Sequence, residues 1–190
     1  GVYYPSSDHG EWLGSRGRHF RMKNGVSIYG GFSGVELALE ERDVGKNETI
    51  LSGDLGAIGN AGDNCYHVFY HPEGTGLNPS AVLDGFTITG GNANNKYPFQ
   101  QRCGGGMYNR QSSPTVRNCW FVGNSAEYAG GGMYNYQSGP IVTSCAFSSN
   151  SSFYGGGMFN WRGSNPELTG CTFSGNSALH SGGGIDNGDN

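Results

Sequence analysis

The chain has 190 residues and a net charge of −4; it shows no basic patch for nucleic acid, and no apolar run reaches the roughly 20 residues of a membrane-spanning helix. Glycine supplies 36 residues without the every-third-residue spacing of collagen, and 10 Phe, 11 Tyr and 3 Trp exclude a disordered chain. Glycine at a long period with aromatics between indicates a repeat fold with tight corners.

Residues 1–103 are expected to form irregular turns of the fold that the second half repeats regularly. Loop insertions are predicted at 33–48 and 93–102. In the first of these, Ser33 stands three residues before Glu36, a capping-box spacing that predicts a short helical turn. Turn residues bound four strand-like units, which are Gly25–Phe32, Thr49–Asp54, Tyr66–His71 and Ala81–Asn92.

Residues 104–190 form a regular array. The segment "GGGMYN" begins at Gly104 and Gly130, "GGGMFN" begins at Gly155, and "GGGIDN" begins at Gly182. Four columns of equivalent residues follow, which are Met107, Met133, Met158 and Ile185; Cys119, Cys145 and Cys171; Phe121, Phe147 and Phe173; and Asn124, Asn150 and Asn176.

Each unit of about 26 residues contains three short β-like runs separated by Gly, Ser and Asn. This is too short for helix-pair repeats or propeller blades, and a leucine ladder is missing. We therefore predict an all-β parallel β-helix, a solenoid of about seven coils with three short strands per coil. The coils form one continuous domain, which we expect to belong to a longer chain or a stacked assembly.

In such a coil, equivalent side chains stack as ladders. The Met, Cys and Phe columns are expected inside. The Asn column is expected at a corner where the asparagine backbone is left-handed, and the Gly triplets at bends. The Cys column predicts buried thiols, because stacked neighbours make poor disulfides. Cys65 and Cys103 could pair, but five cysteines leave at least one unpaired.

These residues resemble two known groups. The F-x-x-N motif at Phe121, Phe147 and Phe173 and the Gly-Gly-Gly-[Met/Ile] segments resemble chlamydial polymorphic outer membrane proteins. "KNGVSIYGGFSG" and "ETILSGDL" resemble bacterial right-handed parallel β-helix repeat proteins of the pectate-lyase-like superfamily. The resemblance implies a right-handed coil and an extracellular or cell-surface location. Members of these groups include adhesins, surface proteins and polysaccharide-degrading enzymes.

Residues for catalysis are sparse. The only candidates lie in the first half. Asp54 and Asp84 follow strands and stand next to glycine, as turn carboxylates do, and the further candidates are Arg42, Lys46 and Asp63. His67 and His71 are four apart, a metal spacing on a helix and not on a strand. No cofactor is expected. Calcium could bind Asp186 and Asp189, although a solvated terminal turn is the favoured interpretation of both acids.

A strip of aromatic side chains is expected on the outer face, opposite the Met column. It would contact a glycan or another copy, unless loops cover it. Asn47 begins a sequon and is a candidate glycosylation site. The strip consists of Tyr108, Tyr134, Phe159, Tyr136 and Trp161, beside Arg110.

The sequence favours a non-catalytic extracellular structural or adhesive protein. Neither end carries a visible polar cap, so copies are expected to stack head to tail into filaments. Its other expected partner is a cell-surface or extracellular polysaccharide. The alternatives are a polysaccharide lyase or hydrolase, suggested by the superfamily resemblance, and a carbohydrate-binding module that uses Tyr134 and Trp161.

Overall fold

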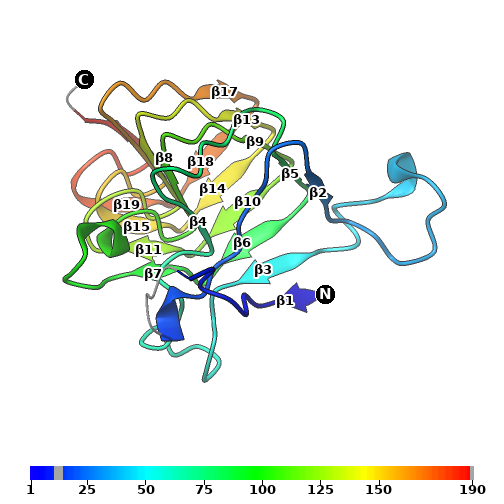
Figure 1. The fold of residues 1–190 in the computed structure, drawn as a ribbon, viewed down its shortest axis with the longest axis horizontal. Coiled ribbons are helices and arrows are strands. Elements are labelled where there is room, and N and C mark those ends of the chain that lie inside the picture. Colours follow the sequence, from blue (N-terminus) through cyan, green and yellow to red (C-terminus); the bar gives the residue numbers. More distant parts are fainter. Residues whose placement is uncertain (11–14, 189–190) are drawn as a thin grey trace.

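The computed structural model describes residues 1–10 and 15–188, and its regular structure is nearly all β-strand (Figure 1). The strands lie in four sheets, and every pair of named strands in the described residues runs parallel. The short 3₁₀ helices are η1 (Ser15–Gly17), η2 (Leu39–Glu41) and η3 (Phe99–Arg102).

The first sheet contains, in spatial order, β1 (Val2–Tyr3), β3 (Ile50–Ser52), β6 (Thr87–Thr89), β10 (Trp120–Val122), β14 (Ala146–Ser148) and β18 (Thr172–Ser174). The second contains β19 (Ser177–Ser181), β15 (Ser151–Tyr154), β11 (Ser125–Ala126) and β7 (Asn92–Ala93). The third contains β20 (Ile185–Asn187), β16 (Met158–Trp161), β12 (Met133–Tyr136), β8 (Met107–Arg110) and β4 (Phe69–His71). The fourth contains β17 (Glu167–Thr169), β13 (Ile141–Thr143), β9 (Thr115–Arg117), β5 (Val82–Asp84) and β2 (Ser27–Tyr29).

The strand registers follow the sequence columns. Met133 pairs with Met107 and Met158, and Phe147 pairs with Phe121 and Phe173. The prediction of three strands per repeat was wrong, because four occur. The additional strand lies in the second sheet, where polar segments such as Ser125–Ala126 have no apolar run to reveal them.

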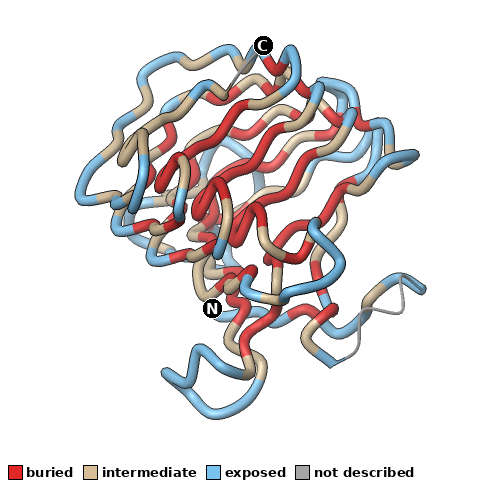
Figure 2. Tube along the Cα trace, turned by 90° about the vertical axis from the view of Figure 1, so that its left-hand side faces the viewer, coloured by how far each residue is buried: buried red, intermediate tan, exposed pale blue. Residues whose placement is uncertain are grey.

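The interior is built from these columns. Phe121 and Phe147 stack with ring centroids 4.7 Å apart and a 4° angle between ring planes, close to the spacing of parallel strands. Both rings are fully buried, as are Met107 and Met133, and Figure 2 shows the buried segments of successive repeats side by side. All five cysteines are free thiols, and burial raises the pKa of the Cys65 thiol to about 12.

The Asn column forms a continuous amide ladder. Asn124 Nδ2 donates to Asn150 Oδ1 at 3.2 Å, and Asn150 Nδ2 donates to Asn176 Oδ1 at 2.9 Å. The expected left-handed backbone lies one residue earlier, for example at Ser149 with a φ of 54°. The asparagine side chains can then turn inward and satisfy buried backbone groups, as Asn150 Nδ2 does at the Phe121 carbonyl.

The glycine triplets are required by close backbone approach. Gly104 has a φ of 69°, and a Cβ on Gly105 would lie 2.2 Å from the Ser125 carbonyl oxygen. A Cβ on Gly106 would lie 2.4 Å from the Gly132 carbonyl oxygen in the next repeat. Only glycine lets the backbone pass this close.

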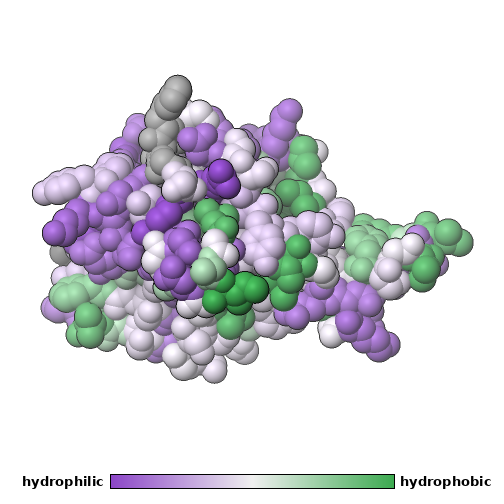
Figure 3. Space-filling model, turned by 90° about the horizontal axis from the view of Figure 1, so that it is seen from below, coloured by the Kyte–Doolittle hydropathy of each residue, from purple (hydrophilic) through white to green (hydrophobic). Residues whose placement is uncertain are grey.

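The segment that carries η2 projects from the sheets (Figure 1). Glu36 Oε1 accepts from Ser33 N and Ser33 Oγ at 2.7 and 2.8 Å, yet the helical turn begins only at Leu39. Apolar Val35 and Leu37 are 82% and 96% exposed there, and Figure 3 shows green surface on this projection. It is an apolar arm without cover in the described residues.

Candidate functional site

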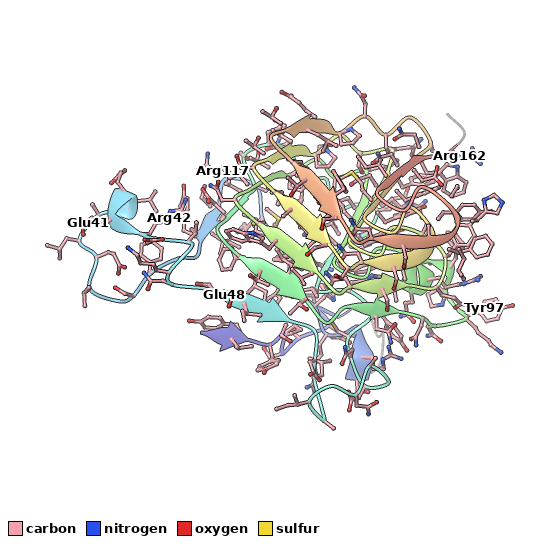
Figure 4. The ribbon with its side chains drawn as sticks, turned by 180° about the vertical axis from the view of Figure 1, so that it is seen from behind. Glu41, Arg42, Glu48, Tyr97, Arg117 and Arg162 are labelled. Carbon is pink, nitrogen blue, oxygen red and sulfur yellow. The ribbon has the colours of Figure 1, made fainter. Side chains whose placement is uncertain are left out.

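Asp84 and Arg42, two of the candidate catalytic residues, come together at the base of the projecting segment. Arg42 Nη2 lies 2.7 Å from Asp84 Oδ1, and Arg117 Nε lies 2.6 Å from Asp84 Oδ2. Asp84 ends β5 and is the register partner of Arg117 on β9, while Arg42 reaches in from the loop. Figure 4 shows Arg42 at the base of this loop, near Arg117.

The Asp84 carboxylate is fully engaged. Its side chain is 1% exposed, and Asn118 Nδ2 donates a further bond to Oδ1 at 2.9 Å. Burial alone would raise the pKa of Asp84, but the bonds from Asn118, Arg42 and Arg117 outweigh it and hold the pKa below its ordinary value. The cluster therefore ties the loop to the fourth sheet, and no oxygen is left free for general-base chemistry.

Beside this cluster runs a groove of about 320 Å³, between the loop and the outer face of the first sheet. Val44 and Glu48 line the loop side, and Thr87 and Trp120 line the sheet side. Glu48 Oε1 accepts from Thr87 Oγ1 at 2.9 Å, so the loop also closes onto the sheet here. Sequence reasoning did not single out Trp120, because its column contains no other aromatic residue.

The remaining candidates of the first half lie apart from this cluster. Asp54 begins the loop after β3, and its Oδ2 accepts from Gly59 N at 3.0 Å. His67 and His71 are buried, with Nδ1 of each bonded within the protein, to the Gly104 carbonyl and to Asn109 Oδ1. The two histidines are structural groups in this arrangement.

The aromatic strip is not the open surface that alternation predicted. Tyr108, Tyr134 and Phe159 are 3%, 1% and 6% exposed. They form a second apolar cluster, against which Tyr128 and Tyr154 pack. The Met column lies in the main core and the aromatic residues lie in this separate cluster, so the alternative of a covered strip, left open by the sequence, describes Tyr108, Tyr134 and Phe159.

Tyr136 and Trp161 remain half-buried at the margin of this cluster. Their rings meet edge to face, with centroids 5.5 Å apart. Arg110 lies over Tyr136 and Arg162 over Trp161, at 5.1 and 5.3 Å from the ring centroids. The faces expected to bind a sugar are therefore partly covered by guanidinium groups.

At the C-terminal end the strip opens into a hollow of about 420 Å³. Tyr154 and Trp161 form aromatic walls, and His180 and Asp186 supply polar groups. Asp186 Oδ2 accepts from Ser181 Oγ. Aromatic walls with a few polar side chains are typical of a small-molecule or sugar site.

A second row of asparagines was not predicted at all. Asn109 Nδ2 donates to Asn135 Oδ1 at 3.0 Å, and the row continues through Asn160 to Asn187 at 2.9 and 2.8 Å. The repeated "MYN" and "MFN" letters were the available signal. An inward asparagine two residues after an inward methionine is what strand alternation implies.

The predicted modification and metal residues can be placed in part. Asn47 is half-buried, and its Nδ2, the atom that a glycan would modify, donates to the Gly31 carbonyl at 3.2 Å. Asp189 lies outside the described residues. Within 1–10 and 15–188, no three His, Cys, Asp or Glu side chains form a metal cluster, and no helix is long and apolar enough to cross a membrane.

Comparisons with protein-family models, curated proteins and solved structures found no match for the chain. The resemblance carried by the F-x-x-N and Gly-triplet motifs therefore stays a prediction.

Proposed function

We propose that the chain is a right-handed parallel β-helix that acts as a non-catalytic, extracellular structural or adhesive element, adding coils of a second copy head to tail. The observation that carries the proposal is the reduced burial of the interior columns at the last strands. The right hand and the extracellular setting rest on the motif resemblance.

At the C-terminal end the columns lose their cover. Val142, Phe147 and Met158 are 0% exposed, whereas their register partners Leu168, Phe173 and Ile185 are only partly buried. Strands β17 to β20 each pair on one side only within the described residues. Unpaired parallel strand edges above an apolar column favour the addition of another coil, whether from a continuing chain or, as proposed, from a second copy.

The opposite end offers a complementary surface. Around β1 to β4, Phe20, Ile28, Leu51 and Phe69 line an apolar hollow of about 360 Å³. An apolar hollow at one end and partly exposed Phe, Leu and Ile at the other form a heterologous pair of surfaces. Such a pair generates open filaments when repeated.

The catalytic alternative gains no support from Asp84 and Arg42. Asp84 is held by two arginines, and Asp54 belongs to a different loop, where its Oδ2 accepts from Gly59 N. A polysaccharide lyase or hydrolase needs a free base or a carboxylate pair.

Electron microscopy and sedimentation of the purified chain test the stacking proposal. A matched variant is Gly184→Ala. An added Cβ at Gly184 meets only the Phe173 side chain, with Cβ at 3.4 Å, so the single chain should fold. In the preceding repeat, the Gly184 carbonyl oxygen lies 2.5 Å from the Cβ position of Gly157. An added coil would bring a backbone carbonyl equally close to the new Cβ of Gly184→Ala and would clash with it.

Wild-type filaments that Gly184→Ala abolishes would support the proposal. Dispersed wild-type particles at the highest attainable concentration would exclude it, as would filaments that form equally well from the variant.

The hollow at Trp161 favours a second candidate, adhesion to a glycan. Its aromatic walls and the Asp186 carboxylate are the supporting observation. A polysaccharide panel, assayed for binding and for cleavage, should show binding that Trp161→Ala weakens at least about tenfold. Trp120→Ala, in the separate groove, is the matched control. Equal binding by wild type and Trp161→Ala would remove this site from consideration.

A further inference from the structure

The loop of residues 54–64 is closed tightly at its base. Cys65 N donates to the Gly53 carbonyl at 2.8 Å, so Asp54 and Asn64 are the first and last residues inside the closure. Asp63 directly precedes Asn64. Three side chains with oxygen atoms thus begin and end one loop.

Both carboxylates turn into the loop. Asp54 Oδ2 accepts from Gly59 N at 3.0 Å. Asp63 Oδ2 accepts from Ala57 N at 2.9 Å and from Asn60 Nδ2 at 3.1 Å. Each carboxylate therefore uses one oxygen to shape the loop and keeps the other.

The remaining oxygens have no donor. Asp54 Oδ1, Asp63 Oδ1 and Asn64 Oδ1 are all buried, and no hydrogen-bond partner from the described chain reaches them. Asn64 is only 9% exposed. Buried polar atoms are almost always paired, so three unpaired oxygens in one short loop call for a common partner.

We propose that this loop binds one Ca²⁺ ion through Asp54 Oδ1, Asp63 Oδ1 and Asn64 Oδ1. The three atoms are hard oxygen ligands with two negative charges, and no thiol or imidazole among them favours zinc. Calcium accepts irregular sets of six to eight oxygens, so loop carbonyls and water complete its shell, whereas Mg²⁺ demands a near-ideal octahedron. The site stands independently of the stacking proposal.

Of the two arginines beside the loop, Arg16 bonds to backbone and amide oxygens and not to the carboxylates. Arg16 Nε donates to the Asn64 carbonyl at 2.6 Å, and its Nη2 donates to the Asn92 carbonyl and to Asn94 Oδ1, both at 2.9 Å. These bonds hold the end of the loop through the Asn64 backbone and leave its side-chain oxygen unused. A hollow of about 330 Å³, lined by Gly62 and Asp63 and by a second arginine, Arg18, gives solvent access to this region.

Calorimetric titration of the chelator-treated chain with CaCl₂ tests the proposal. We expect one site per chain with a Kd of about 10⁻⁴–10⁻³ M or tighter. Terbium luminescence, excited through Tyr66 two residues after Asn64, gives a second readout. Asp54→Asn and Asp63→Asn each remove one charge at nearly constant volume and should weaken binding at least about tenfold.

Two variants serve as matched controls. Asp43→Asn alters an exposed loop carboxylate that bonds Gly45 N and Lys46 N, and it should leave binding unchanged. Asp186→Asn tests the acid near the C-terminal end. Calcium should also raise the melting temperature of the wild type, with reversal by chelator, which needs no variant.

Absence of heat, luminescence and thermal shift at about 10 mM calcium would overturn the site. Binding that survives both Asp54→Asn and Asp63→Asn, or that is lost only in Asp186→Asn, would overturn its location.

Discussion

His71 Nδ1 lies 2.8 Å from Asn109 Oδ1, at the head of the second asparagine row. Asn109 Nδ2 donates onward to Asn135, so its Oδ1 is the acceptor and His71 carries a proton on Nδ1. His71 Nε2 then accepts from Met22 N at 3.3 Å. The neutral ring satisfies both neighbours, and burial lowers the pKa of His71 to about 4.

Stability should therefore fall as the solution becomes acidic. Burial also lowers the pKa of His67, to about 3. Unfolded histidine binds its proton near pH 6.5, so between about pH 6.5 and 4 the unfolded state holds more protons than the folded state. Each histidine then lowers the unfolding free energy by up to about 1.4 kcal/mol per pH unit, which urea unfolding across this range measures.

His71→Asn extends the asparagine row by one member and should remove roughly half of this pH dependence. His180→Asn changes an exposed histidine and should leave the dependence as in the wild type. If the unfolding free energy of His71→Asn depended on pH as steeply as that of the wild type, His71 would not be a source of the pH dependence.

Asp84→Asn should destabilise the fold and release the projecting segment. The change leaves Arg42, whose side chain is 14% exposed, without its anion, at a cost of about 3 kcal/mol in unfolding free energy. Arg117→Met should cost less, since the Arg117 side chain is 43% exposed. Denaturant unfolding measures both, and equal costs would argue against Asp84 and Arg42 as the anchor.

The Asp84 contribution should depend on pH with a defined sign. Its folded pKa lies below the ordinary value, so the stabilisation is present above about pH 4 and is lost as the pH falls through the folded pKa. Comparison of wild type and Asp84→Asn between about pH 5 and 2 should show their stabilities converging. A constant difference would exclude this linkage.

Asn150→Ala should be among the substitutions that lower the unfolding free energy most. Asn150 is fully buried, donates to the Phe121 carbonyl and accepts from Asn124 N and Nδ2. Alanine leaves these groups unpaired, at about 3 kcal/mol or more. Asn176→Ala, at the half-buried end of the row, should cost clearly less in the same unfolding assay. The reverse order would mean that burial does not determine how much each asparagine of the row contributes to the unfolding free energy.

Gly132→Ala should strongly destabilise the fold. Its Cβ would lie 2.5 Å from the Gly157 carbonyl oxygen, and overpacking of this kind costs about 3 kcal/mol. Gly184→Ala occupies the same column in the last repeat without that contact, so far-UV circular dichroism and melting should remain near wild type. A stable Gly132→Ala chain would show that the repeats can separate locally.

Much of the fold could be predicted because stacked repeats convert sequence columns into contacts. Phe121, Phe147 and Phe173 were expected to stack as one column, and they are register partners. The Met, Phe and Asn columns needed only a period and the alternation of a strand.

The errors share one physical origin. Alternation gives the face of Tyr134 but not whether another layer covers that face, and Tyr128 and Tyr154 supply that layer from a different part of each repeat. The second-sheet strands escaped notice because Ser125 and Ala126 are held by ladder bonds and not by an apolar pattern. Asp84 was recognised as a turn acid, but its partner Arg42 lies 42 positions away in the chain.

Both asparagine rows point the same way. Every Nδ2 of Asn124, Asn135 and Asn150 donates toward the partner later in the chain. The side-chain amide dipoles therefore add along the molecule, as peptide dipoles do in a helix, and leave oxygen toward one end and N–H toward the other. A copy added at the C-terminal end in the reverse sense would set donor against donor, so the proposed stacking should favour a single orientation of the copies.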